Sequence, residues 1–231
     1  MVQENNLNIL YEDKHLIAVN KRSSEIVQGD STGDIPLCDH LKQYLKLKYN
    51  KPGNVYVGVP HRLDRPVSGV VLFTRTSKAL SRLNEMFRNG EVSKTYWALV
   101  QNMPPQTHDA LTHYIRKNKK LNKSFISPNK KNNYKEARLT YTLIGKTNHY
   151  FLLEIDLHTG RHHQIRAQLS TIDCPVKGDI KYGSRRSNTN GSICLHARSI
   201  SFIHPVRKDL ITITAPLPDT SIWNACDDLF G

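Results

Sequence analysis

Short apolar runs recur along the chain without regular alternation with helical segments, and this pattern constrains the fold most. Helical spacing is found only in residues 37–48 and 77–90, and in a short stretch after Gly160 with Ile165 and Leu169 inward. The strand-like runs are residues 9–11, 16–19, 55–59, 70–73, 95–100, 139–144, 151–157, 193–195, 200–203 and 210–213. Regular alternation would favour a doubly wound parallel sheet. The sequence instead predicts an α+β fold, with a mixed, mainly antiparallel sheet and flanking helices.

Capping residues mark the ends of the two longer helices. Asp34 is a candidate N-cap for the first, with Pro36 in its first turn. Thr76 or Ser77 is the candidate cap for the second. Gly90 follows that helix, where a left-handed residue is favoured, so it is predicted to end there.

The charge balance points to an anionic partner. The 231 residues include 33 Lys plus Arg and 20 Asp plus Glu, which gives a formal net charge of +13. Such an excess favours nucleic acid or an anionic membrane as partner. No apolar stretch approaches the ~20 residues that span a bilayer, and no secretory signal is visible. We therefore expect a cytoplasmic, monomeric protein of one domain over residues 1–231, with no separate N-terminal RNA-binding domain.

The four cysteines are widely scattered and form no C-x-x-C pair. This spacing supports neither a zinc ribbon nor a redox motif. The simplest interpretation is buried, reduced thiols in a cytosolic protein.

Residues 116–138 contain nine basic residues opposed only by Glu136. The segment has little periodicity and many Asn residues. It could be a solvated, mobile loop, or an arm that binds phosphates and supplies sequence-independent affinity. The sequence leaves both interpretations open.

The densest polar run extends from His61 to Gly69, between two predicted strands. Within it, Asp64 is flanked by Arg62 and Arg65, whose positive charges favour the ionised carboxylate. Such a carboxylate in a cleft can act as a nucleophile, a base or a metal ligand. A structural salt bridge in a loop is the alternative.

A second polar run, residues 158–166, contains three histidines and ends at Arg166. Gly160 lies between His158 and His162, and the run contains no carboxylate, so a metal site is not predicted. Arg166, next to an apolar helix position, can point a guanidinium into a cleft to bind a carboxylate or phosphate.

Two strand segments complete the set of motifs. Alternation places Lys94, Tyr96 and Ala98 on one face of a strand. Tyr96 is either an ordinary strand aromatic or a platform for stacking on a base. The sequence Leu195-His196-Ala197 carries no chemical signal of its own.

The order and spacing of these motifs resemble the RluA-type family of RNA pseudouridine synthases. The resemblance covers roughly residues 7–215 and includes the opening Ile9-Leu10-Tyr11-Glu12-Asp13 with Val19-Asn20-Lys21. The matching motifs are His61-Arg62-Leu63-Asp64 through Ser68-Gly69, Lys94-x-Tyr96-x-Ala98, Gly160-Arg161-x-His163-Gln164-Ile165-Arg166 and Leu195-His196-Ala197.

The resemblance implies a pseudouridine synthase fold with a deep basic cleft, and it assigns roles to individual residues. Asp64 would be the essential aspartate, Arg166 its ion-pair partner, and Tyr96 the ring that stacks on the flipped base and takes part in proton removal. Substrate-binding roles would fall to Arg62, Leu195, Lys94 and Arg161. The implied reaction detaches uracil and rejoins it through carbon 5, with ribosomal or transfer RNA as partner and no metal or other cofactor. The chain contains no phosphate-cradling or dinucleotide-binding glycine motif.

Two other functions remain as alternatives. A non-catalytic RNA-binding protein could keep the fold, but it would not need Asp64, Tyr96 and Arg166 together. A metal-dependent phosphoesterase built on the histidines would lack the clustered carboxylates that a two-metal site needs.

Overall fold

The computed structural model describes residues 7–30 and 33–227. The chain folds into two compact units, and each unit contains two separate stretches of sequence. The first unit comprises Met1–Val92 and Ser199–Pro216, and the second comprises Ser93–Arg198 and Leu217–Gly231.

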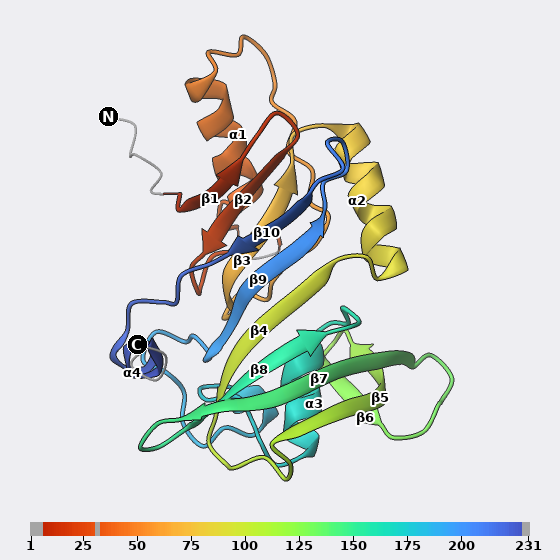
Figure 1. The fold of residues 1–231 in the computed structure, drawn as a ribbon, viewed down its shortest axis with the longest axis vertical. Coiled ribbons are helices and arrows are strands. Elements are labelled where there is room, and N and C mark those ends of the chain that lie inside the picture. The colour runs from red at the N-terminus through yellow and green to blue at the C-terminus, as the bar shows by residue number, and fades with distance from the viewer. Residues whose placement is uncertain (1–6, 31–32, 228–231) are drawn as a thin grey trace. The chain divides into compact units, whose positions relative to one another are not determined.

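The first unit contains antiparallel strands and two helices (Figure 1). Its strands pair as β1 with β2, β2 with β3, and β9 with β10. The last five residues of β9 belong to this unit. The elements are β1 (Ile9–Glu12), β2 (Leu16–Lys21), α1 (Leu37–Lys48), β3 (Ser68–Thr74), α2 (Ser77–Asn89), β9 (Leu195–Ile203) and β10 (Leu210–Thr214).

Strands β2 and β3 are the centre of the first unit. All seven residues of β3 are buried, as are five of the six residues of β2. Because alternate side chains of a strand point to opposite faces, both faces must be covered. Helix α1 contributes Leu37, Leu41 and Leu45, spaced by four residues, to the buried interior.

The helix ends follow the predicted capping pattern only in part. The Thr76 hydroxyl accepts a hydrogen bond from the Ala79 backbone at 3.2 Å, and Gly90 ends α2 with φ of 77°. Both predictions are confirmed. The prediction for Asp34 is wrong, because α1 begins after Pro36 without a side-chain cap and the Asp34 carboxylate pairs with Arg65.

The second unit contains five antiparallel strands in the order β4-β8-β7-β5-β6. Helix α3 lies against β5 and β6 (Figure 1). The elements are β4 (Ser93–Val100), β5 (His108–Asn118), β6 (Lys123–Ser127), β7 (Lys135–Lys146), β8 (Phe151–Leu157), α3 (Gln164–Thr171), the 3₁₀ turn η1 (Ile180–Tyr182) and α4 (Ser221–Asp227). The first four residues of β9 also belong to this unit.

Two apolar clusters stabilise the second unit. One joins Leu99 and Leu152 of neighbouring strands to Trp223 of α4. The other joins Ile115 of β5 to Ala167 of α3. The four cysteines of the chain are buried and free, as expected.

The predicted fold class is confirmed, because helices accompany strands that pair antiparallel in both units. Two local predictions are wrong. Residues 55–59 form no strand: only Gly58 makes a bridge, to Thr74, and Tyr56 is exposed. The runs 193–195 and 200–203 are not separate strands, because β9 runs without interruption from Leu195 to Ile203. Across the described ranges, none of the helices has the length and apolar character needed to cross a membrane.

Candidate functional site

The predicted site residues are divided between the two units. Arg62 and Asp64 belong to the first unit. The other five predicted residues belong to the second unit and are Lys94, Tyr96, Arg161, Arg166 and Leu195.

The Asp64 loop, residues 61–67, directly precedes β3 in the first unit. Asp64 is half-buried and Arg62 is exposed. The Val67 N–H donates to the Asp64 carbonyl at 3.0 Å, which closes a tight turn. Leu63 and Val67, which precede and follow Asp64 in the sequence, are buried. These two apolar anchors fix the loop, so Asp64 is presented from a defined backbone.

Buried Lys21, the last residue of β2, supports the Asp64 loop. Its ammonium donates to the carbonyls of Val67 at 2.6 Å, Arg65 at 3.1 Å and Arg22 at 2.9 Å. The pKa of Lys21 is lowered to about 7, chiefly by burial. The negative charges of Glu25 and Asp64 act in the opposite direction and only partly offset the effect of burial. A buried lysine with three carbonyl partners holds the backbone on both sides of the turn.

The role of Lys21 was not predicted from its sequence. The only available signal was a lysine shortly after the apolar run 16–19, within a motif that carried the family resemblance.

The start of the Asp64 loop is anchored by His61. Its Nε2 accepts a hydrogen bond from the Leu72 N–H of β3 at 2.9 Å. Its ring lies 5.1 Å from that of Phe87 on α2. His61 therefore joins the loop to both a strand and a helix of the first unit.

In the second unit, β4 carries Lys94 and Tyr96. Tyr96 is buried, with 8% exposure, and lies opposite Ile155 of β8. Burial lowers the pKa of Lys94. Leu195 is buried at the beginning of β9.

Arg166 is held by a bidentate ion pair within the second unit. It is buried on α3, and its Nε and Nη2 donate to Asp179 Oδ2 at 2.6 Å and Oδ1 at 2.9 Å. This bidentate pair fixes the plane of the guanidinium. The role of Asp179 was missed, although its position between Gly178 and the Tyr182-Gly183 pair marked a tight turn.

Arg161 and the histidines have separate partners. The Arg161 Nε donates to the Glu136 carbonyl at 2.9 Å. His158 Nε2 lies 2.8 Å from the Thr140 hydroxyl, whereas His162 lies beside Asn122 and Ser124. In residues 7–30 and 33–227, no group of three or more His, Cys, Asp or Glu side chains could hold a metal ion.

Parts of the basic segment 116–138 form strands joined by turns, so the segment is not one continuous loop. It spans the end of β5, all of β6 and the start of β7. On this hairpin Arg116 lies opposite Phe125, and its guanidinium lies 5.1 Å from the centre of the Tyr134 ring. Phe125 is 38% exposed. The strands therefore present cations beside aromatic rings, a combination suited to RNA.

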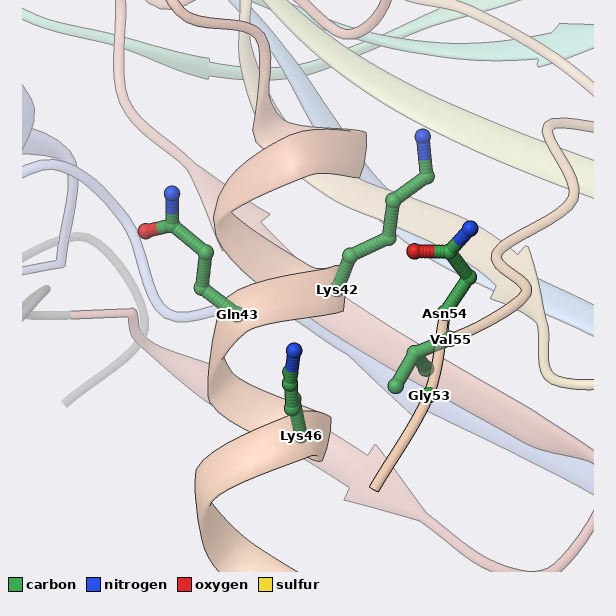
Figure 2. A pocket seen from close by; sticks show the side chains of 6 residues that line it. All are labelled: Lys42, Gln43, Lys46, Gly53, Asn54 and Val55. Atoms are coloured by element: carbon green, nitrogen blue, oxygen red, sulfur yellow. The ribbon is translucent and has the colours of Figure 1, made fainter. Parts of the chain in front are cut away.

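A pocket of about 420 Å³ lies in the first unit, between α1 and the segment 53–55 (Figure 2). Its lining residues are Lys42, Gln43, Lys46, Gly53, Asn54 and Val55. None of these is a predicted site residue. The Lys42 ammonium is already paired with Asp39 at 2.7 Å, so we assign the pocket no role in the site.

Comparison with solved structures defines the fold class. Human RNA Pseudouridylate Synthase Domain Containing 4 superposes with a TM-score of 0.79 over 96% of this chain and 93% of its own, at 23% identity. Human RNA Pseudouridylate Synthase Domain Containing 1 gives a TM-score of 0.71 at 22% identity, covering 96% and 87% of the two chains. These similarities show a pseudouridine synthase fold.

Sequence comparison places the chain in a family. The RNA pseudouridylate synthase family model matches residues 15–171. The tRNA pseudouridine synthase C of Haemophilus influenzae is 30% identical, covering 97% of this chain and 98% of the relative. This chain belongs to the RNA pseudouridylate synthase family.

Other relatives are longer than this chain. The ribosomal large subunit pseudouridine synthase C of Buchnera aphidicola subsp. Baizongia pistaciae is 33% identical over 90% of this chain, which spans 66% of that relative. The predicted family membership is confirmed.

Proposed function

We propose that this protein is an RNA pseudouridine synthase that isomerises specific uridines in ribosomal or transfer RNA. The observation that carries the proposal is the family match over residues 15–171, which contain Asp64, Tyr96 and Arg166. The names of the relatives support both RNA classes as substrates. The cytoplasm, where these RNAs are made and modified in bacteria, is the proposed location.

The proposed reaction is an isomerisation. The bond between uracil N1 and ribose C1′ breaks, a bond between C5 and C1′ forms, C5 loses a proton and N1 gains one. No atom or electron is gained or lost overall. The residues of the site must therefore bind the uridine, orient it and transfer protons. Unstacking the base costs a few kcal/mol, which phosphate contacts and aromatic stacking offset.

In this proposal Asp64 is the catalytic aspartate and Arg166 its ion-pair partner. The rigid Arg166–Asp179 pair supports the assignment, because a preorganised guanidinium can orient a carboxylate without losing further entropy. Tyr96 stacks on the flipped base. The buried position of Tyr96 in β4 supports this role, since its ring is held by the strand.

The remaining predicted residues bind the substrate in this proposal. Arg62 contacts a phosphate or fills the space left by the flipped nucleotide, and its exposure supports that role. Leu195 forms part of the pocket wall. Lys94 and Arg161 are assigned to phosphate contacts.

The decisive experiment maps pseudouridines in RNA from cells with the gene, without it, and with the Asp64→Ala variant. We expect one or more sites to disappear on deletion and to stay absent with Asp64→Ala, while the purified variant binds RNA as the wild type does. Asp39→Ala, which changes a half-buried aspartate of α1 that is not a predicted site residue, is the matched control and should restore modification. Unchanged maps together with RNA binding would favour the non-catalytic RNA-binding alternative.

We also propose that the cationic hairpin β5–β6 helps to hold the RNA. Replacing Lys119 and Lys120 by alanine should weaken binding and flatten the slope of log affinity against log salt by about 1.5, because each lost phosphate contact contributes about 0.7–0.9. The exposed pair Lys51 and Lys78, replaced in the same way, is the control. Equal slopes for the two double variants would leave the hairpin without a role in RNA binding.

A further inference from the structure

A buried tyrosine of η1 joins the cationic hairpin to helix α3 within the second unit. Tyr182 is 5% exposed. The Ser124 N–H of β6 donates to its hydroxyl oxygen at 2.7 Å, and that oxygen lies 2.9 Å from His163 Nδ1. Burial and nearby cations lower the pKa of His163 to about 2, so its imidazole stays neutral and Nδ1 can accept a hydrogen bond from the tyrosine hydroxyl. One hydroxyl thus links a strand of the hairpin to the residue that precedes α3.

The ring of Tyr182 makes a second link between the same elements. The Arg166 guanidinium on α3 and the Lys123 ammonium on β6 each lie 5.1 Å from its centre. Cations at this distance are attracted to an aromatic ring. Tyr182 therefore contacts Arg166 through its ring and the hairpin through both its hydroxyl and its ring.

Further hydrogen bonds attach the hairpin to the start of α3. The Ser124 hydroxyl donates to the His162 carbonyl at 2.6 Å. His162 Nε2 lies 3.2 Å from Asn122 Oδ1, and the Lys181 ammonium donates to the Asn122 carbonyl at 3.0 Å. Every one of these contacts joins residues distant in the sequence. A displacement of the hairpin must therefore move the start of α3.

The turn that carries Tyr182 also carries the other partner of Arg166. Asp179 precedes Tyr182 by three residues, and residues three apart in a 3₁₀ turn lie above one another. The carboxylate of Asp179 and the ring of Tyr182 both contact Arg166. This turn therefore supplies two contacts that orient Arg166, and the turn is bonded to the hairpin.

We propose that Tyr182 is a positioning residue that couples RNA bound by the hairpin to the placement of Arg166. The coupling rests on the proposed function, in which Arg166 serves Asp64. The hairpin carries Arg116, Lys117, Lys119, Lys120 and Lys123. Phosphates held by these cations restrict the hairpin, and the hairpin, through Tyr182, restricts α3.

The test replaces Tyr182 by phenylalanine, which keeps the ring and removes the hydroxyl. Tyr141→Phe is the matched control, because Tyr141 is another buried tyrosine of the second unit and makes none of the contacts above. Three quantities are measured: affinity for an unmodified transfer-RNA transcript, the single-turnover rate constant on an RNA containing the mapped uridine, and amide exchange of residues 162–169 with and without the transcript.

We expect Tyr182→Phe to bind the transcript within about 2-fold of wild type, since contacts to phosphates supply most of the affinity for RNA and the variant keeps its cations. Its rate constant should fall about 10-fold, because small misplacements of active-site groups cost one to two orders of magnitude. The transcript should protect residues 162–169 in the wild type and in Tyr141→Phe but not in Tyr182→Phe. If Tyr182→Phe does not fold, Ser124→Ala takes its place, because it removes the bond to His162. This variant should also lower the rate constant and the protection of residues 162–169.

Several results would overturn the coupling. One is a Tyr182→Phe or Ser124→Ala variant that melts at lower temperature yet keeps the wild-type rate constant and protection, since Tyr182 would then be structural only. Another is a transcript that leaves exchange in residues 162–169 of the wild type unchanged. If the wild type protects those residues but forms no pseudouridine, the proposed function fails and the coupling stands.

Discussion

Replacing Lys21 by methionine should change the pH dependence of stability in a defined way. Methionine keeps the apolar stem and removes the donors to the Val67, Arg65 and Arg22 carbonyls. Losing the donor to a buried carbonyl costs about 1–3 kcal/mol, and each partly buried bond contributes about 0.5–1.5 kcal/mol. At pH 9, where the folded-state lysine is neutral and makes fewer of these bonds, we expect a loss of about 2–4 kcal/mol in the free energy of unfolding.

The loss should shrink as the pH falls. Burial lowers the pKa of Lys21 from 10.5 to about 7 in the folded state. Below pH 7 the amine is protonated in both the folded and unfolded states, and above pH 10.5 it is neutral in both. Between these values only the unfolded chain holds the proton, so the wild type gains about 1.4 kcal/mol of stability per pH unit. Lys21→Met lacks this gain. The difference in free energy of unfolding between the wild type and Lys21→Met should therefore fall by roughly 2.5 kcal/mol from pH 9 to pH 7.

Urea unfolding of the wild type and Lys21→Met at pH 6, 7, 8 and 9 measures this difference directly. Groups that titrate identically in both proteins cancel in the comparison. Lys78→Met, which replaces an exposed lysine of α2, is the matched control for the loss of a lysine. A difference between wild type and Lys21→Met that stays constant from pH 6 to pH 9 would refute the reasoning.

Two further substitutions test the turn that holds Arg166. Asp179→Asn should lower the free energy of unfolding by about 3–5 kcal/mol, because it removes a carboxylate that is paired with a buried guanidinium. Asp209→Asn, which breaks an exposed pair with Arg207, should leave the urea midpoint unchanged, and equal midpoints for the two variants would contradict the assignment. Gly178→Ala should cost about 1–3 kcal/mol by the same measurement, since φ is +92° and a Cβ would lie 2.8 Å from Asn188 Nδ2 and Ser192 O. Gly29→Ala, with open space around it, is the control, and a Gly178→Ala variant as stable as Gly29→Ala would remove the need for glycine there.

The two longer helices could be predicted because their signals are local. The spacing of Leu37, Leu41 and Leu45 is helical in the sequence and buried in the structure. The cap at Thr76 needs only the next three residues. The Asp64 loop was found for a related reason, since its motif occupies a short continuous stretch.

Strand β6 of the hairpin could not be predicted because polar residues fill its buried positions. Ser124 and Ser127 are 3% and 2% exposed, so β6 lacks the apolar alternation that marks a strand. The Ser124 hydroxyl bonds to His162 and the Ser127 hydroxyl to Asn129, so burial costs these groups little. At these two positions hydrogen bonds, one to a remote residue and one local, replace hydrophobic contacts and leave no periodic pattern.

The partner of Arg166 was also beyond local reasoning. Ile165 and Leu169 correctly indicated the buried face of α3. Asp179 is brought to the guanidinium by a turn between Gly178 and Gly183, both with positive φ. A sequence shows that such a turn can form, but not which side chain it will face.

The division of the chain has a consequence for biosynthesis. The first unit needs residues 199–216, which are translated only after most of the second unit. Strand β10 pairs with β9 residues 199–203, so neither is available while the first 92 residues leave the ribosome. At the usual ~5–20 residues per second, roughly 7–28 s separate the synthesis of β3 from that of β10. During that interval the sheet of the first unit is incomplete. Chaperones that recognise unpaired strands can bind the nascent chain during this time.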